Sequence, residues 1–149
     1  MNAKSPAFFH ICMADDDPDD VRLAQEALLQ NDLPVQLTHV HDGQDLLDIL
    51  RAKGRFSGQE RIQPHLILLD LNMHPRDGRS ALKEIKSDPQ LSAIPIVIYT
   101  TSDSPPDIYD AYSLGANCYI TKPFSFVELS NTFDVLVRFW MNYAKLPPA

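Results

Sequence analysis

Five short apolar segments alternate along the chain with longer stretches in which apolar positions recur every three or four residues. The short segments are rich in Ile, Leu and Val and cover residues 8–14, 35–40, 65–69, 95–100 and 118–121. Continuous apolar strands separated by amphipathic helices are typical of a parallel sheet that helices cover on both faces. The pattern therefore predicts an α/β fold of five strand-helix repeats, (βα)₅, with a doubly wound parallel five-stranded sheet.

Helix start and stop signals support these repeats. Asp17 can cap the first helix, and Pro18 suits its first position, so this helix is expected to run to about Asn31. The second helix is expected to begin at Asp42-Gly43 and the third at Asp77-Gly78. Asp88-Pro89 should end the third helix, and Pro105-Pro106 should begin the fourth. Residues 54–64 form a polar loop longer than the usual connection, and we expect this insertion to decorate the surface.

The last predicted helix covers residues 125–144 and carries an apolar stripe. The stripe residues recur at spacings of three and four and should pack on the sheet: Phe126, Leu129, Phe133, Leu136, Trp140 and Tyr143. Val135 and Phe139 fall outside this stripe, which makes them candidates for an exposed surface that binds a partner.

Size, charge and cysteine content narrow the function. With 149 residues, 44% of them hydrophobic, we expect one domain over residues 1–149 with a core from about residue 8 to residue 145. A formal net charge of −7 argues against nucleic-acid binding. No segment has the length of a signal peptide or a membrane span, so we expect a cytoplasmic protein. Cys12 and Cys118 lie in predicted strands and are interpreted as core thiols.

Polar side chains follow four predicted strands at the same edge of the sheet. Asp15 and Asp16 end the first strand, Asp70 follows the third, Thr100 ends the fourth and Lys122 follows the fifth. Ligands of open doubly wound sheets bind at this edge, and three carboxylates placed there repel one another unless a cation neutralises them. The all-oxygen ligand set favours Mg²⁺. A carboxylate nucleophile beside a hydroxyl, an ammonium and Mg²⁺ matches phosphoryl transfer.

The chain resembles the receiver domain of two-component response regulators, which has a flavodoxin-like fold, from about residue 8 to residue 145. The resemblance rests on the motifs Ala14-Asp15-Asp16-Asp17, Leu69-Asp70-Leu71-Asn72-Met73, Asp77-Gly78, Thr100-Thr101, Leu114-Gly115-Ala116 and Tyr119-Ile120-Thr121-Lys122-Pro123-Phe124. It implies a signalling protein rather than an enzyme, with Asp70 phosphorylated by a sensor histidine kinase. It also implies four Mg²⁺ ligands, namely Asp15, Asp16, Asp70 and the backbone carbonyl of Asn72. Thr100 and Lys122 would grip the phosphoryl group, and Thr100 and Tyr119 would form the conformational switch.

Other features refine this resemblance. The family often has Pro four residues after the phospho-acceptor, whereas here His74 takes that place and Pro75 follows, so the covering loop is expected to differ. The strand at 117–120, the insertion and the aromatic last helix make the chain similar to single-domain regulators that accompany bacterial phytochrome kinases. That similarity implies a phytochrome-type kinase as partner and a homodimer through the carboxyl-terminal region, at Val135, Phe139 or neighbouring residues. We expect the signal to pass to an unidentified downstream protein by docking, by phosphate relay or by dimerisation.

Two other functions compete with this interpretation. One is a phosphate-independent interaction module with a receiver-like fold, which the intact set of acids, hydroxyl and lysine argues against. The other is a phosphatase of the haloacid dehalogenase type, whose opening motif Asp15-Asp16-Asp17 could imitate. That family needs a further acidic pair, and after Lys122 the last helix offers only Glu128 and Asp134. Labelling at Asp70 would exclude the phosphatase, whereas labelling at Asp15 would favour it.

Overall fold

One sheet of five parallel strands organises the chain. The computed structural model describes residues 8–74 and 77–148, and its strands are hydrogen-bonded in the order β2-β1-β3-β4-β5. The strands are β1 (Phe9–Ala14), β2 (Val35–Val40), β3 (Leu66–Leu69), β4 (Ile96–Thr100) and β5 (Cys118–Thr121). The predicted doubly wound sheet is confirmed, and no predicted strand end is wrong by more than one residue.

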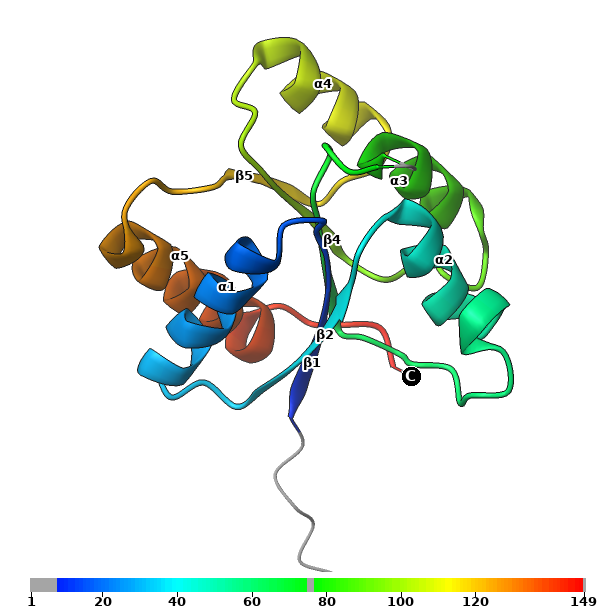
Figure 1. The fold of residues 1–149 in the computed structure, drawn as a ribbon, viewed down its shortest axis with the longest axis horizontal. Helices are drawn as coiled ribbons and strands as arrows, with labels where there is room; N and C mark the ends of the chain where they lie inside the picture. The colour runs from blue at the N-terminus through cyan, green and yellow to red at the C-terminus, as the bar shows by residue number, and fades with distance from the viewer. Residues whose placement is uncertain (1–7, 75–76, 149) are drawn as a thin grey trace, which may run out of the picture.

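Helices cover both faces of the sheet (Figure 1). α1 and α5 lie on one face, and α2 and α3 lie on the other together with part of α4. The helices are α1 (Pro18–Gln30), α2 (Gly43–Arg51), α3 (Gly78–Ser87), α4 (Pro105–Ser113) and α5 (Phe126–Arg138). Each begins after a side chain that accepts a backbone N–H, and these caps are Asp17, Asp42, Asp77, Ser104 and Ser125. Within the described residues, no helix is long and apolar enough to cross a membrane.

Alternate strand residues fill two cores, one on each face of the sheet. Leu66 and Leu68 of β3 pack with α1 and α5, whereas Ile67 and Leu69 pack with α2 and α3. Because β1, β3 and β4 are buried on both faces, they read in the sequence as continuous apolar runs. Both cysteines are free thiols, and Cys12 of β1 is fully buried.

The end of α5 differs from the prediction. A π-helical turn, Phe139–Tyr143, follows Arg138 and rotates the last residues away from the α-helical stripe. Tyr143 is therefore 76% exposed rather than packed on the sheet. Val137, which lies one turn after Phe133 and outside the predicted stripe, is fully buried. The other five stripe residues pack in the core as predicted.

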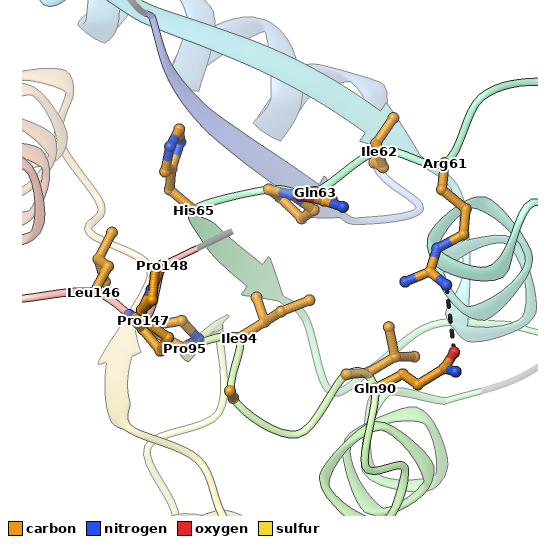
Figure 2. Close-up of a pocket in the computed structure, with 13 residues that line it drawn as sticks. Arg61, Ile62, Gln63, His65, Gln90, Ile94, Pro95, Leu146, Pro147 and Pro148 are labelled. Carbon is orange, nitrogen blue, oxygen red and sulfur yellow. Dashed lines mark hydrogen bonds between the residues drawn. The ribbon is translucent and has the colours of Figure 1, made fainter.

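The insertion at residues 54–64 is largely exposed, as predicted, but it is more than surface decoration. A 3₁₀ turn, Gly54–Phe56, follows α2, and both Phe56 and Ile62 pack against the core beside α2 and α3. The insertion also lines a cavity of about 300 Å³ together with the loop before β4 and the tail after α5 (Figure 2). Across this cavity Arg61 donates a hydrogen bond to Gln90 (3.3 Å). The cavity lies at the amino ends of β3 and β4, opposite the edge that carries Asp70.

Candidate functional site

Four strand ends bring the predicted chemistry together. Asp15, Asp70 and Lys122 each follow a strand directly, and Thr100 is the last residue of β4. The chain order of the strands reverses between β1 and β3, which is where open sheets of this type bind ligands. Asp15, Asp70 and Thr100 are three of the four buried polar side chains among the described residues. The fold thus concentrates its buried polarity at this edge.

Lys122 is the cation at the centre of the site. Its Nζ lies 2.8 Å from Asp15 Oδ2, 2.7 Å from Asp20 Oδ2 and 2.9 Å from Asp70 Oδ2. Burial acts to lower the pKa of Lys122, but its pairing with the three carboxylates outweighs this effect and raises that pKa. Lys122 is therefore fully protonated at neutral pH.

Both carboxylate oxygens of Asp70 are held by donors. Oδ1 accepts hydrogen bonds from the Thr100 hydroxyl (2.7 Å) and the Asn72 backbone N–H (3.1 Å). Oδ2 accepts one from Lys122 Nζ (2.9 Å). Donors fixed in these directions can stabilise negative charge that develops next to the carboxylate. These contacts hold the Asp70 carboxylate in a fixed orientation, which suits the nucleophile role predicted from the sequence.

Asp15, Asp16 and Asp70 form a cluster suited to a hard cation. Each offers a carboxylate oxygen, and these oxygens lie within 4.8 Å of one another. Asp15 Oδ1 accepts a hydrogen bond from the Asp17 backbone N–H (2.9 Å). Asp15 Oδ2 is the one buried side-chain nitrogen or oxygen among the described residues that has no hydrogen bond, and its contact with Lys122 Nζ (2.8 Å) is an ion pair. A buried oxygen with free lone pairs beside two more carboxylates fits a divalent cation.

Metal binding at this cluster is expected to weaken as the pH falls below about 6. Burial raises the pKa of Asp15 to about 6, since it outweighs the opposing effect of Lys122. A carboxylate must lose its proton to bind metal, so a raised pKa moves the loss of affinity up from about pH 4 to about pH 6. We expect the Kd for Mg²⁺, measured by calorimetry, to increase about tenfold between pH 7 and pH 5.

The matched control is Asp15→Asn, which has no titrating carboxyl at this position. It should bind Mg²⁺ more weakly than the wild type but with a flatter pH profile over the same range. A wild-type Kd that does not change between pH 7 and pH 5 would count against Asp15 as a ligand.

Gly78 allows the start of α3 to lie against the backbone of Asp70. A Cβ at this position would collide with the Asp70 carbonyl oxygen and lie 2.9 Å from the Leu71 Cα. We expect Gly78→Ala to lower the free energy of unfolding by about 2 kcal/mol, because backbone has little room to move. Urea unfolding followed by circular dichroism measures this change. An unchanged unfolding midpoint would mean that α3 shifts freely away from Asp70.

Tyr119 is linked to the segment that follows Thr100. The Tyr119 hydroxyl donates to the Ser102 carbonyl (2.8 Å), and the Ser102 hydroxyl donates to Asp107 in the first turn of α4. Asp107 also accepts from Arg79 of α3 (2.8 Å). A continuous set of contacts therefore connects Tyr119 with α4 and α3.

Several predicted positions lie on the open side of the site. Asp16 and Asn72 are exposed beside Asp15 and Asp70. The Asn72 backbone carbonyl as a metal ligand stays a prediction. In the covering loop, His74 is exposed, and Pro75 lies outside the described residues.

Two further residues at the site are not predicted by the sequence pattern. Asp20 occupies the third position of α1, where an acidic side chain ordinarily reaches back to the helix cap, but here its carboxylate accepts a hydrogen bond from Lys122 (2.7 Å). His39 of β2 donates from Nε2 to the Asp15 backbone carbonyl (2.7 Å) and thereby holds the strand end that carries Asp15. The sequence signal for Asp20 is ambiguous, and His39 stands in a strand without a motif around it.

Sequence comparison shows the family. The family description "response regulator receiver domain" matches residues 11–134. Response regulator Rcp1 of Synechocystis sp. is 37% identical over 139 residues, which are 93% of this chain and 93% of Rcp1. The probable methanogenesis regulatory protein FilR2 of Methanothrix harundinacea is 33% identical over 147 residues, which are 99% of this chain and 92% of FilR2.

Solved structures are similar over almost the whole chain. The phosphorylated cyanobacterial phytochrome response regulator RcpA has a TM-score of 0.86 at 41% identity, and the match covers 95% of this chain and 100% of RcpA. The Mn²⁺-bound form of Rcp1 has a TM-score of 0.83 at 36% identity, covering 93% of this chain and 99% of Rcp1. Receiver domains are signalling proteins that bind a divalent metal and are partners of sensor histidine kinases. On its sequence match, fold and site, this chain belongs to the response regulator receiver domains.

Proposed function

We propose that Asp70 accepts a phosphoryl group from a phosphorylated histidine of a sensor kinase. The observation that carries this proposal is the Asp70 carboxylate, held by Thr100 at 2.7 Å and by Lys122 at 2.9 Å. In the transfer, an Asp70 oxygen forms a bond to phosphorus, the P–N bond to the kinase histidine breaks, and the histidine nitrogen leaves with the electron pair. Attack of water on the phosphorus later releases phosphate and restores the carboxylate.

The proposed metal is Mg²⁺, with four ligands: Asp15, Asp16, Asp70 and the backbone carbonyl of Asn72. When bound, it offsets negative charge on the phosphoryl oxygens. Lys122 offers an ammonium to the same group, and Thr100 offers a hydroxyl that already points at Asp70. Both side chains already donate to the Asp70 carboxylate and are therefore in place to donate to a phosphoryl group bonded to it, which favours attack at Asp70.

The proposed output is a change at Thr100 and Tyr119. When the Thr100 hydroxyl turns to a phosphoryl oxygen, the segment that follows it must adjust, and Ser102 in that segment accepts from Tyr119. Ser102 also contacts Asp107 in α4. A shift at Thr100 would therefore change the surface that α4 and β5 present to a downstream protein.

The proposed kinase partner is of the bacterial phytochrome type. RcpA supports this choice because it is a cyanobacterial phytochrome response regulator and is 41% identical to this chain. Profiling phosphotransfer from purified kinases tests the choice. Faster transfer from a phytochrome kinase than from others is expected, whereas a preference for an unrelated kinase would overturn it.

We further propose a homodimer through β5 and α5. β5 is an edge strand, and an open apolar groove of about 590 Å³ runs between it and α5. Val135 and Phe139 line the groove and are 69% and 51% exposed. An unpaired strand edge beside an apolar groove suits the same surface of a second copy, because such a contact is self-complementary.

Light scattering tests the dimer. Val135→Glu should convert the dimer to a monomer, because it places a charge in the groove. Val127→Glu is the matched control, since Val127 is 70% exposed on the same helix but does not line the groove. A wild-type protein that is monomeric at high concentration would refute the proposal.

Incubation with Mg²⁺ and a small acyl phosphate tests the phospho-acceptor function. The expected result is a gain of one phosphoryl mass, located at Asp70 by peptide mass spectrometry. No gain, under conditions in which another receiver is labelled, would support the phosphate-independent module instead. A label at Asp15 would support the hypothesis of a phosphatase of the haloacid dehalogenase type.

A further inference from the structure

Asp20 is the unexplained carboxylate of the site. Three carboxylates surround Lys122 Nζ, and the shortest of the three distances, 2.7 Å, is the one to Asp20. The ammonium makes aligned hydrogen bonds to Asp20 and Asp70, whereas its contact with Asp15 is an ion pair without that alignment. Asp20 is thus a principal partner of Lys122 and not a distant charge.

The other two partners of Lys122 have a second task. Asp15 and Asp70 belong to the carboxylate cluster that fits a divalent cation, and Asp20 does not. Asp70 is also the proposed nucleophile, and the oxygen that bonds to phosphorus loses its negative charge. A bound cation and a bound phosphoryl group therefore both weaken the hold of Asp15 and Asp70 on Lys122. Asp20 is the one carboxylate of the three that keeps its charge and its freedom to bind Lys122.

The position of Asp20 suits this task. It lies in the first turn of α1, which Asp17 caps and which packs against α5. Its side chain is 27% exposed and that of Lys122 only 8%, so the ion pair is largely shielded from water. A carboxylate on a capped helix is held more firmly than one on a loop.

We propose that Asp20 is a positioning residue that keeps Lys122 directed at the phosphoryl group after Asp15 and Asp70 have been engaged. This inference rests on the proposed phosphorylation of Asp70. It assigns to α1 a part in the transfer that the strand ends alone do not supply. Asp20 itself touches neither the phosphoryl group nor the cation.

The test compares Asp20→Ala and Asp20→Asn with the matched control Asp19→Asn. Asp19 is the neighbouring acid, and its carboxylate pairs with the exposed Arg22 rather than with Lys122. Asp19→Asn therefore removes the same charge from the same helix turn. With saturating Mg²⁺ and acyl phosphate, Asp20→Ala should lower the maximal rate constant of phosphorylation about tenfold. Asp20→Asn, which keeps a neutral acceptor, should lie between Asp20→Ala and the wild type, and Asp19→Asn should match the wild type.

Two readouts separate positioning from a loss of structure or of metal. The Kd for Mg²⁺, measured without a phosphoryl donor, should change less than about twofold in Asp20→Asn, because Asp20 is not in the cluster. Nitrogen-15 spectra of the metal-loaded, phosphorylated protein should show a slowly exchanging Lys122 ammonium in the wild type and faster exchange in Asp20→Ala.

Each outcome decides the inference. Wild-type rates and exchange in both Asp20 variants would overturn it while leaving the phosphorylation of Asp70 intact. An equal loss of rate in Asp19→Asn would also overturn it, since charge at the helix start would then explain the effect. A wild-type protein that takes no label at all would overturn the proposed function, and this inference with it.

Discussion

Asp70→Asn is expected to abolish phosphoryl incorporation and to leave the protein folded. Asparagine keeps the shape of the side chain but supplies no carboxylate to bond to phosphorus, so labelling by acyl phosphate should fall below about one per cent of wild type. In the wild type, Thr100 and Lys122 donate hydrogen bonds to Oδ1 and Oδ2 of Asp70. The amide oxygen of the variant can still accept a hydrogen bond from one of these two side chains. Intact-protein mass spectrometry measures the label.

The same variant should be more stable than the wild type in the absence of metal. Three carboxylates, those of Asp15, Asp20 and Asp70, surround one ammonium, and a fourth, that of Asp16, lies close to Asp15 and Asp70. Removing one negative charge from this excess relieves repulsion, and we expect the free energy of unfolding to increase by about 1 kcal/mol.

The matched control for Asp70→Asn is Asp134→Asn. Among the described residues, Asp134 forms its ion pair with Arg138, on the surface of α5. It should be labelled like the wild type. Full labelling of Asp70→Asn would show that another residue is the nucleophile. A label found at Asp15 would support the phosphatase hypothesis.

Lys122→Met is expected to have the second largest effect. Methionine fills much of the same space but leaves Asp15 and Asp70 buried beside each other without a cation. Removing one partner of a buried ion pair typically lowers the free energy of unfolding by about 3 kcal/mol, and we expect that loss in metal-free protein at pH 7. Phosphorylation should also become much slower, because one donor to the phosphoryl oxygens is lost.

The loss in Lys122→Met should depend on metal and on pH. Mg²⁺ should restore part of the stability, because the cation replaces the missing charge. Lower pH should also restore part of it, because the pKa of Asp15, already about 6, will rise further without Lys122, and its protonated form carries no charge to repel Asp70. Unfolding curves at pH 7 and pH 5, with and without Mg²⁺, measure these effects.

Lys86→Met is the control for Lys122→Met. Lys86 is also partly buried, but it donates to the backbone carbonyls of Ser92 and Ile94 and to the side chain of Asn117 instead of to carboxylates. Its loss should destabilise the protein equally with and without Mg²⁺. A Lys122→Met variant that behaved in the same way would contradict the electrostatic account of the site.

The elements and the strand ends were predictable because their signals are local. A strand buried on both faces must be apolar throughout, so β3 could be recognised from Leu66–Leu69 alone. A charged residue directly after such a run has few structural reasons to be there, so its position indicates a functional role for Asp70. The parallel topology then places all carboxyl ends at one edge, and Asp15, Thr100 and Lys122 follow from that geometry.

The remaining features depend on contacts between distant segments, which a single sequence does not reveal. In the sequence, Asp20 has the position of an acidic residue that stabilises the start of a helix. Only the fold brings it next to Lys122, which lies 102 residues later in the chain. Tyr143 keeps the spacing of the apolar stripe, but the π-helical turn before it changes the direction of its side chain. Phe56 and Ile62 are isolated apolar residues in a polar loop, so no periodic pattern in the sequence predicts that they pack against the core.

The separation of Asp15 and Lys122 along the chain also has a consequence for biosynthesis. These residues follow β1 and β5, so the site cannot form until the last strand has been synthesised and has joined the sheet. A cation held there binds only the finished fold and would favour it over partly folded chains, by about 2.7 kcal/mol at a hundred times its Kd. A kinase that requires this assembled site would therefore phosphorylate only folded chains. Incompletely synthesised chains would not be phosphorylated.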